Sequence, residues 1–219
     1  MTSYLFDAYG TLFDVHSAIA REGKALGEKA AAISALWRAK QLEYSWVLSA
    51  MAASEGVDFE TLTARGLDFA LAAHGVADDA LRARLLSAYD HLDAYPDVRE
   101  ALVRLKQASH RTAVFTNGTR RMVEKAIAAA KLGDLIDTII TVEPCGAFKP
   151  VEAVYAHALA QSGARLAGDV RFVSSNRWDV AGGVRFGFTT YWINRAGMPD
   201  EYPTQAPAQI LGSLSELPI

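Results

Sequence analysis

Short apolar runs recur along this chain, separated by stretches with helical character. The strand-like runs cover 4–8, 112–116, 138–142, 170–174 and 189–193, and the helix-like stretches cover 98–107, 120–131, 151–161 and 178–186. Alternation of strand and helix is the pattern of a parallel α/β sheet. The runs are mostly apolar on both faces, as strands need to be when helices cover both sides of the sheet.

The segment between 14 and 95 breaks this pattern, because strand signals almost disappear there. Apolar residues recur instead at helical spacing, at Ala35, Ala39, Leu42 and Trp46 and again at Leu67, Ala70 and Leu71. We therefore predict an α/β fold with a Rossmann-like parallel sheet core, formed by 1–13 and 96–219, and an inserted helical cap domain at 14–95. The tail after Gly197 is rich in proline and turn residues and is expected to wrap the surface.

Composition narrows the function classes. With 51% hydrophobic residues the chain can form a sizeable core, and a net charge of -3 gives no electrostatic argument for nucleic acid or an anionic membrane. No apolar stretch approaches a membrane span, and no basic leader precedes the first strand. The single cysteine, Cys145, rules out an internal disulfide and is expected to be a packed or idle thiol. We expect a cytoplasmic protein with neither nucleic acid nor membrane as partner.

Polar side chains stand where the predicted strands end. In open parallel sheets ligands bind beyond the carboxyl ends of the strands. The first strand ends at Asp7, followed by Tyr9 and Thr11. The later ends carry Thr116-Asn117-Gly118, Lys149 before Pro150, Ser174-Ser175-Asn176, and Asp179 beside Trp178. The sequence thus gathers two aspartates, a lysine and several hydroxyl and amide groups at one edge.

Each of these groups also has a purely structural interpretation. Asp7 alone suits a turn, Lys149 a solvated loop, and Asn117, Asn176 or Asp179 the start of a helix. These interpretations together require several strand ends to place polar groups side by side by accident. A buried, unpaired carboxylate is also costly. We therefore interpret the edge as an active site.

The spacing Asp-x-x-x-Thr, then Thr-Asn, Lys-Pro and a late Asp resembles the haloacid dehalogenase superfamily. The segments FDAYGTLFDVHS, ISALWRAKQLEY, FTNG, FKP and FVSSNRWDVAG resemble the L-2-haloacid dehalogenases within it. The similarity extends from Phe6 to about Arg195. FVSSNRWD and ALWRAKQLEY are its specific parts, since FDxxGT marks only the superfamily.

This resemblance implies hydrolysis of (S)-2-haloalkanoic acids to (R)-2-hydroxy acids by covalent catalysis. Asp7 would attack the α-carbon and expel halide, and water would then hydrolyse the Asp7 ester. Phosphatases of the superfamily carry a second acid where this chain has Tyr9; that acid protonates the leaving group, and its backbone carbonyl binds magnesium. Halide needs no proton, so the resemblance implies a reaction without metal or cofactor.

The resemblance also assigns roles at the sheet edge. Lys149 would hold Asp7 ionised by its opposite charge. Asp179 would position or activate the hydrolytic water, with Asn176 and Ser174 orienting it. Thr11 would hydrogen-bond the region of the nucleophile.

The resemblance also assigns roles to residues that a purely structural interpretation explains almost as well. Tyr155 matches a tyrosine that supports this network, although a packed helix tyrosine looks the same in sequence. Arg38 resembles the cap arginine that stabilises the departing halide, although an arginine among Leu36, Trp37 and Leu42 also suits a side chain that extends to water. Asn117 would share the halide through its amide.

The remaining assignments concern the substrate. Thr116 and the backbone at Ala8 and Tyr9 would bind its carboxylate, and Tyr9, Leu42 and Trp178 would form an apolar wall around its alkyl group. Trp178 suits core packing equally well. The family usually has serine where this chain has Thr116, which keeps the hydroxyl and adds a methyl group to the carboxylate pocket.

Three other functions remain as alternatives. A magnesium-dependent phosphatase of the same superfamily is disfavoured by Tyr9 and by the absence of a second acid beside Asp179. A non-catalytic binding protein is disfavoured by the intact set of Asp7, Lys149, Asn176 and Asp179. A nucleotide-binding module lacks any glycine-rich phosphate loop after a strand. Family members commonly pair through the cap, so a homodimer is an expectation of the resemblance alone.

Overall fold

A computed structural model describes residues 2–219, and its centre is a six-stranded sheet. All neighbouring strands are parallel, in the order β3-β2-β1-β4-β5-β6. The strands are β1 Ser3–Phe6, β2 Arg111–Thr116, β3 Thr138–Thr141, β4 Val170–Ser174, β5 Thr189–Ile193 and β6 Gln209–Leu211. The predicted α/β fold with a Rossmann-like parallel sheet is confirmed.

The register of the central strands aligns their carboxyl ends. β1 lies between β2 and β4, and its last residue, Phe6, is level with Val114 and Val173. Asp7 continues the line of β1, because its backbone N–H donates to the Val173 carbonyl at 2.9 Å. Side chains that follow β1, β2 and β4 therefore begin from the same edge of the sheet.

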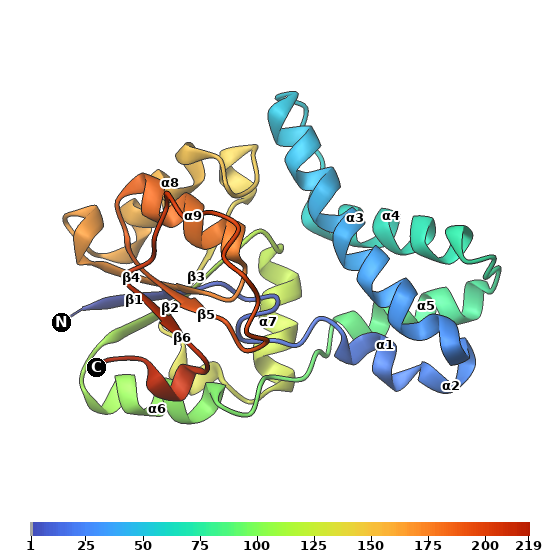
Figure 1. The fold of residues 1–219 in the computed structure, drawn as a ribbon, viewed down its shortest axis with the longest axis horizontal. Coiled ribbons are helices and arrows are strands. Elements are labelled where there is room, and N and C mark those ends of the chain that lie inside the picture. Colours follow the sequence, from blue (N-terminus) through green and yellow to red (C-terminus); the bar gives the residue numbers. More distant parts are fainter. Residues whose placement is uncertain (1) are drawn as a thin grey trace.

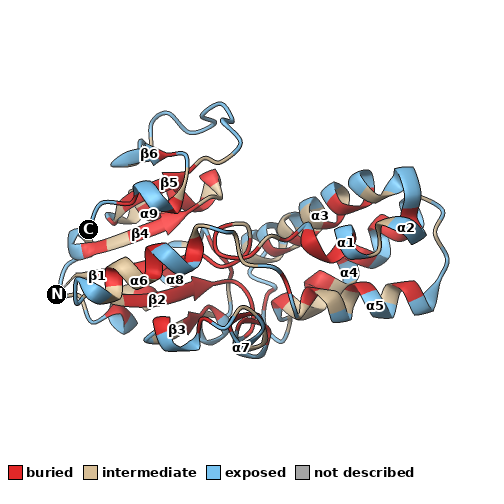
Figure 2. Ribbon diagram, turned by 90° about the horizontal axis from the view of Figure 1, so that it is seen from below, coloured by how far each residue is buried: buried red, intermediate tan, exposed pale blue. Residues whose placement is uncertain are grey.

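Helices cover both faces of this sheet. In Figure 1, α8 and α9 lie on one side and α6 on the other, and Figure 2 shows the strands as mostly buried. These helices are α6 Val98–Gln107, α7 Arg120–Ala129, α8 Glu152–Ser162 and α9 Arg177–Phe186. Short 3-10 turns are η1 Gly27–Lys29, η2 Gly133–Leu135, η3 Glu143–Cys145, η4 Ala167–Asp169 and η5 Leu214–Glu216. The bounds of α6 match the sequence prediction, and the other three lie within two residues of it.

The tail contains one strand that the sequence analysis missed. β6 pairs with β5, with Gln209 opposite Tyr191 and Leu211 opposite Ile193. Three residues in a proline-rich segment give no periodicity to detect. The tail therefore extends the sheet by one strand as well as crossing the surface.

Five helices follow β1 and lie beside the sheet in Figure 1, as a separate layer of the molecule. They are α1 Ser17–Arg21, α2 Gly23–Leu26, α3 Ala30–Ala50, α4 Phe59–Ala73 and α5 Asp79–Tyr89. The chain enters and leaves this helical part side by side, since Asp14 N–H donates to the Asp93 carbonyl at 2.8 Å and Tyr95 N–H to the Leu12 carbonyl at 3.0 Å. We propose 14–95 as the limits of this cap.

The buried face of α3 is not the apolar row that predicted the helix. Ala35, Ala39 and Trp46 are exposed and Leu42 is half-buried. The buried residues of α3 are Ile33, Ser34, Trp37, Gln41 and Ser45. The helix therefore turns several polar side chains into the interior of the cap. None of the helices described in residues 2–219 is long and apolar enough to cross a membrane.

We expect Gly183→Ala to destabilise the core. A Cβ at Gly183 of α9 would lie 2.7 Å from Phe172 Cδ1 and 3.0 Å from Thr190 Cγ2, so the helix must move off β4 and β5. Such overpacking costs about 1–3 kcal/mol of unfolding free energy, measurable by urea denaturation. Gly133→Ala is the matched control, because nothing lies within 4 Å of its added Cβ. Equal midpoints for the two variants would contradict the expectation.

Candidate active site

Asp7 is held at the carboxyl end of β1 by donors on one of its two oxygens. Its Oδ2 accepts from Asn176 Nδ2 at 2.7 Å, Thr11 Oγ1 at 2.9 Å and Ser174 Oγ at 3.4 Å. Within residues 2–219, its Oδ1 meets only Lys149 Nζ, at 3.3 Å. The carboxylate is therefore oriented through Oδ2, and Oδ1 is the less encumbered oxygen.

Lys149 places a fully buried ammonium between two carboxylates. Its Nζ donates to Asp179 Oδ2 at 2.8 Å and to the Phe115 carbonyl at 2.7 Å, in addition to Asp7. Its three N–H donors thus have three acceptors. The backbone N–H of Lys149 donates to Asn117 Oδ1 at 2.9 Å, which fixes the lysine to the end of β2. A buried ammonium needs such partners to offset its lost hydration.

Asp179, in the first turn of α9, is completely buried behind Lys149. Burial raises the pKa of Asp179 to about 6, the Lys149 charge opposes this rise, and the Asp7 charge adds to it. Asp179 Oδ1 accepts from Tyr155 OH at 2.7 Å. Burial first, and then the charge of Asp179, raise the pKa of Tyr155 well above its usual value, so the phenol remains a donor. A Cβ at Gly182 would overlap that hydroxyl, which explains the glycine.

Tyr9 forms an apolar surface next to Asp7. Its buried ring stacks on Tyr89 with centroids 5.6 Å apart and lies 6.2 Å from Phe59. Gly118 makes room for it, because a Cβ there would be 2.6 Å from Tyr9 Cε2. Burial raises the pKa of Tyr9 well above its usual value, so the side chain stays uncharged.

Free donors surround this position. For the backbone N–H groups of Ala8 and Tyr9, no acceptor is found in the part of the chain that the structure describes. Thr116 Oγ1 accepts from the Gly118 N–H at 3.0 Å, which leaves its own proton for another group. Because Asn117 Oδ1 is taken by Lys149, its Nδ2 is likewise left to donate. These donors suit an anion.

Arg38 reaches this edge from α3 of the cap. Its Nη2 donates to the Tyr9 carbonyl at 3.2 Å and lies 3.5 Å from Asn176 Oδ1. Trp178 links the same two parts of the molecule, with its ring edge-on to Trp46 of α3 at 5.3 Å. The site is therefore built from both the sheet edge and the cap.

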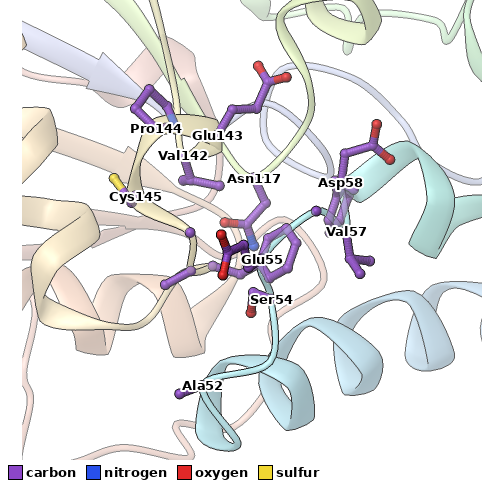
Figure 3. A pocket seen from close by; sticks show the side chains of 15 residues that line it. Ala52, Ser54, Glu55, Val57, Asp58, Asn117, Val142, Glu143, Pro144 and Cys145 are labelled. Atoms are coloured by element: carbon purple, nitrogen blue, oxygen red, sulfur yellow. The ribbon is translucent and has the colours of Figure 1, made fainter.

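Two cavities reach the cluster from outside. One of about 660 Å³ lies between the loop after α3 and the loop after β3, and Figure 3 shows Asn117 among its lining side chains, with Glu55, Asp58 and Glu143. A second, of about 400 Å³, borders Asn176 and Trp178. Asp7 is only 6% exposed and lines neither cavity, so these spaces border the cluster at Asn117 and Asn176.

Comparison with known proteins identifies the family. Residues 1–187 match the model of the haloacid dehalogenase-like hydrolases. (S)-2-Haloacid dehalogenase 4A of Burkholderia cepacia is 42% identical over 97% of this chain and 91% of its own. A crystal structure of a dehalogenase, 41% identical, superposes with a TM-score of 0.95 over 99% of this chain and 95% of that one.

The chain belongs to the (S)-2-haloacid dehalogenase family of these hydrolases. A further member, the L-2-haloacid dehalogenase of Xanthobacter autotrophicus with chloropropionic acid covalently bound, is 31% identical. It superposes with a TM-score of 0.87 and covers 99% of this chain and 96% of its own. The resemblance inferred from the sequence, and the prediction of an enzyme, are confirmed.

The structure of this dehalogenase family member brings the predicted polar residues together. Side chains in direct contact with Asp7 or with one of its partners are Thr11, Arg38, Asn117, Lys149, Ser174, Asn176 and Asp179, and Tyr155 contacts Asp179. Leu42 and Trp178 are half-buried farther out. The structure describes no group of three or more His, Cys, Asp or Glu side chains within residues 2–219 that could hold a metal ion.

Sequence reasoning missed cap residues that contact Arg38 and Tyr9. Gln41 Oε1 accepts from Arg38 Nη1 at 2.6 Å, and Tyr89 and Phe59 pack against Tyr9. The spacing of Arg38 and Gln41, three residues apart on a helix, was the available signal. Nothing in the sequence indicates which aromatic rings of the cap meet Tyr9.

We expect the buried Asp179 to give stability a specific pH dependence. Its pKa is raised from 3.8 to about 6 in the folded chain, so between these values the folded state holds a proton that the unfolded state has lost. Stability from this group is therefore lost as pH rises from about 4 to about 6. Denaturation of both proteins across this range should show that the free energy of unfolding of Asp179→Asn, relative to wild type, increases as pH rises. A constant difference would contradict the raised pKa.

Proposed function

We propose that this chain hydrolyses (S)-2-haloalkanoic acids to (R)-2-hydroxy acids through an ester on Asp7, without metal or cofactor. The observation that carries the proposal is the asymmetry of the Asp7 carboxylate. Three neutral donors anchor Oδ2, while the hydrogen-bond partner of Oδ1 among the described residues is Lys149. A nucleophile oriented in this way is ready for attack on carbon.

In the first step Asp7 Oδ1 bonds to the α-carbon from the side opposite the halogen. The carbon–halogen bond breaks, and its electron pair leaves with the halide. Arg38 and the Nδ2 group of Asn117 are the donors for the developing charge on the halide. Attack from the far side inverts the carbon, so the S substrate gives the R product.

The substrate carboxylate is anionic and needs donors that are not already engaged. The backbone N–H groups of Ala8 and Tyr9 and the Thr116 hydroxyl supply them. Tyr9, Leu42 and Trp178 provide the apolar surface for the alkyl group. This arrangement directs the carboxylate to the sheet edge and the halogen toward Arg38 of the cap.

In the second step water attacks the carbonyl carbon of the Asp7 ester. The carbonyl oxygen is then Oδ2, and the donors that anchor it, from Thr11, Ser174 and Asn176, stabilise its negative charge in the tetrahedral intermediate. Asp179 takes the proton of the attacking water, positioned by Tyr155. The bond from the carbonyl carbon to Oδ1 then breaks, and the departing alkoxide takes the proton from Asp179 to give the hydroxy acid. The new carboxyl group of Asp7 keeps an oxygen from water and loses its remaining proton to solvent.

Two findings support this course over a magnesium-dependent phosphatase. The relative from Xanthobacter autotrophicus carries chloropropionic acid as a covalent adduct. In this chain Tyr9 replaces the second acid, and its phenol is a poor proton donor to a leaving group, because burial raises its pKa well above the usual value. A halide leaves without protonation, whereas a phosphate-bound alkoxide does not.

Two properties implied by the resemblance belong to the same proposal. We propose that two copies pair through the cap, where Val47 of α3 and Met51, the residue after α3, are 47% and 60% exposed. We also propose that the enzyme acts in the cytoplasm, with the haloacid and the halide ion as its small-molecule partners.

The proposed function is tested by chloride release from each enantiomer of 2-chloropropionate in excess EDTA. We expect release from the S enantiomer alone, with (R)-lactate as product, because attack by Asp7 inverts the carbon and needs no metal. Heat-treated protein is the control. If folded protein releases chloride from neither enantiomer, or only after magnesium is added, the proposal is wrong and phosphate esters become the next substrates to assay.

The ester intermediate is tested by mass spectrometry of protein quenched in acid during turnover. We expect the peptide that contains Asp7 to gain the mass of the esterified acid. Asp179→Asn should accumulate more of this adduct than wild type, because ester hydrolysis slows while the nucleophile is intact. Asp7→Asn should show no adduct. Turnover of wild type without any adduct, together with no accumulation in Asp179→Asn, would argue for direct attack of water.

A further inference from the structure

Arg38 reaches the active-site edge on a long side chain, and its position there has to be fixed. A free arginine side chain samples many rotamers, so a useful orientation needs restraint from neighbours. One restraint is the Tyr9 carbonyl, 3.2 Å from Nη2. The shorter one is within the cap, where Nη1 donates to Gln41 Oε1 at 2.6 Å. Gln41 lies three residues further along α3, on the same face of the helix.

Gln41 is itself held firmly in the interior of the cap, where it is 1% exposed. Its Nε2 donates to Thr63 Oγ1 at 2.6 Å and to Tyr89 OH at 3.2 Å. Thr63 Oγ1 donates its own proton to the Phe59 carbonyl at 2.7 Å, so it acts as an acceptor toward Gln41. This network places the amide nitrogen on the Thr63 side and leaves Oε1 facing Arg38.

Backbone packing adds to this restraint. Gly66 of α4 lies very close to α3, since a Cβ there would be 3.2 Å from both the backbone nitrogen of Gln41 and the backbone carbonyl oxygen of Trp37. Trp37 Nε1 donates to the Thr63 carbonyl at 2.7 Å. Gln41 is thus bound into the contact of α3, α4 and α5, and its oxygen is a rigid acceptor.

We propose that Gln41 is a positioning residue, whose amide oxygen holds the Arg38 guanidinium in the orientation that receives the departing halide. The inference rests on the proposed function, because it requires Arg38 to meet a halide. Gln41 acts through Arg38, since its own side-chain bonds go to Arg38, Thr63 and Tyr89. Donors fixed in advance need no reorganisation when charge develops on the leaving group.

The neutral character of Gln41 is part of this role. An amide oxygen orients the guanidinium and leaves its full positive charge available to an anion. A carboxylate at the same place would orient Arg38 equally well and would also offset its charge. The proposal therefore requires residue 41 to be a hydrogen-bond acceptor and to carry no charge.

The test uses Gln41→Met, which keeps the length of the side chain and removes the acceptor. We expect single-turnover ester formation from (S)-2-chloropropionate to slow about 10–100-fold, the range that misplacement of a contributing group produces. (S)-2-Bromopropionate should slow less, because bromide accepts hydrogen bonds more weakly than chloride. The inhibition constant for chloride as product should rise about tenfold, whereas hydrolysis of ester already formed should be unchanged.

Ser45→Ala is the matched control. Ser45 is also buried on α3, about one turn further, and its hydroxyl donates locally to the Leu42 carbonyl at 2.7 Å. It should leave the chloride inhibition constant and the ratio of chloride to bromide rates as in wild type. Gln41→Glu provides a second variant if Gln41→Met does not fold, and its added charge should raise the chloride inhibition constant at least as much.

The outcomes separate this inference from the proposed function. If wild type releases no halide from either substrate, both are wrong. If wild type is active and Gln41→Met or Gln41→Glu matches Ser45→Ala in halide inhibition and leaving-group dependence, Gln41 has only a structural role. Equal slowing of the chloride and bromide substrates with unchanged halide inhibition would likewise overturn the inference.

Discussion

The contacts of the buried Lys149 ammonium are the interactions on which the site depends. It joins Asp7 and Asp179, which follow different strands, and it is bound to the Phe115 carbonyl and through its backbone to Asn117. Two carboxylates this close would repel each other without a charge between them. The lysine therefore connects the end of β1, the end of β2 and the first turn of α9 through one buried ammonium and one backbone N–H.

The division of the site between sheet and cap separates two tasks. The proposed nucleophile Asp7 and the groups proposed to act on its ester lie in the core, at or after the ends of β1 and β4 and on α8 and α9, and the register of β1 and β4 is fixed by backbone pairing. The cap holds Arg38 on a helix whose polar interior orients it. The chain crosses between the two parts only where 12–14 and 93–95 lie side by side. In the proposed mechanism the cap contributes Arg38 and the core contributes Asn117 to the departing halide, and the groups proposed to act on the ester all lie in the core.

Most sequence predictions came from two signals: the periodicity of apolar residues and the polar residues at strand ends. Alternating runs gave the parallel sheet and the bounds of α6, and polar residues at strand ends gave the cluster around Asp7. The apolar row on α3 gave the helix and missed its buried face, because Gln41 and Ser45 are satisfied by partners distant in sequence or by the local backbone. The need for glycine at 118 and 182 was equally invisible, since it arises from contact with Tyr9 and Tyr155. β6 was not predicted, because a strand of three residues is too short to show a periodic pattern.

The shared lysine also has a consequence for the order of events. Before the reaction, two carboxylates share one ammonium, and the charge of Asp7 helps to raise the pKa of Asp179. In the proposed ester Asp7 is neutral, so this contribution disappears and the pKa of Asp179 falls. Lys149 is then left with a single counterion. The proposed base therefore becomes more fully ionised once there is an ester to hydrolyse, so in this mechanism the first half-reaction prepares the second.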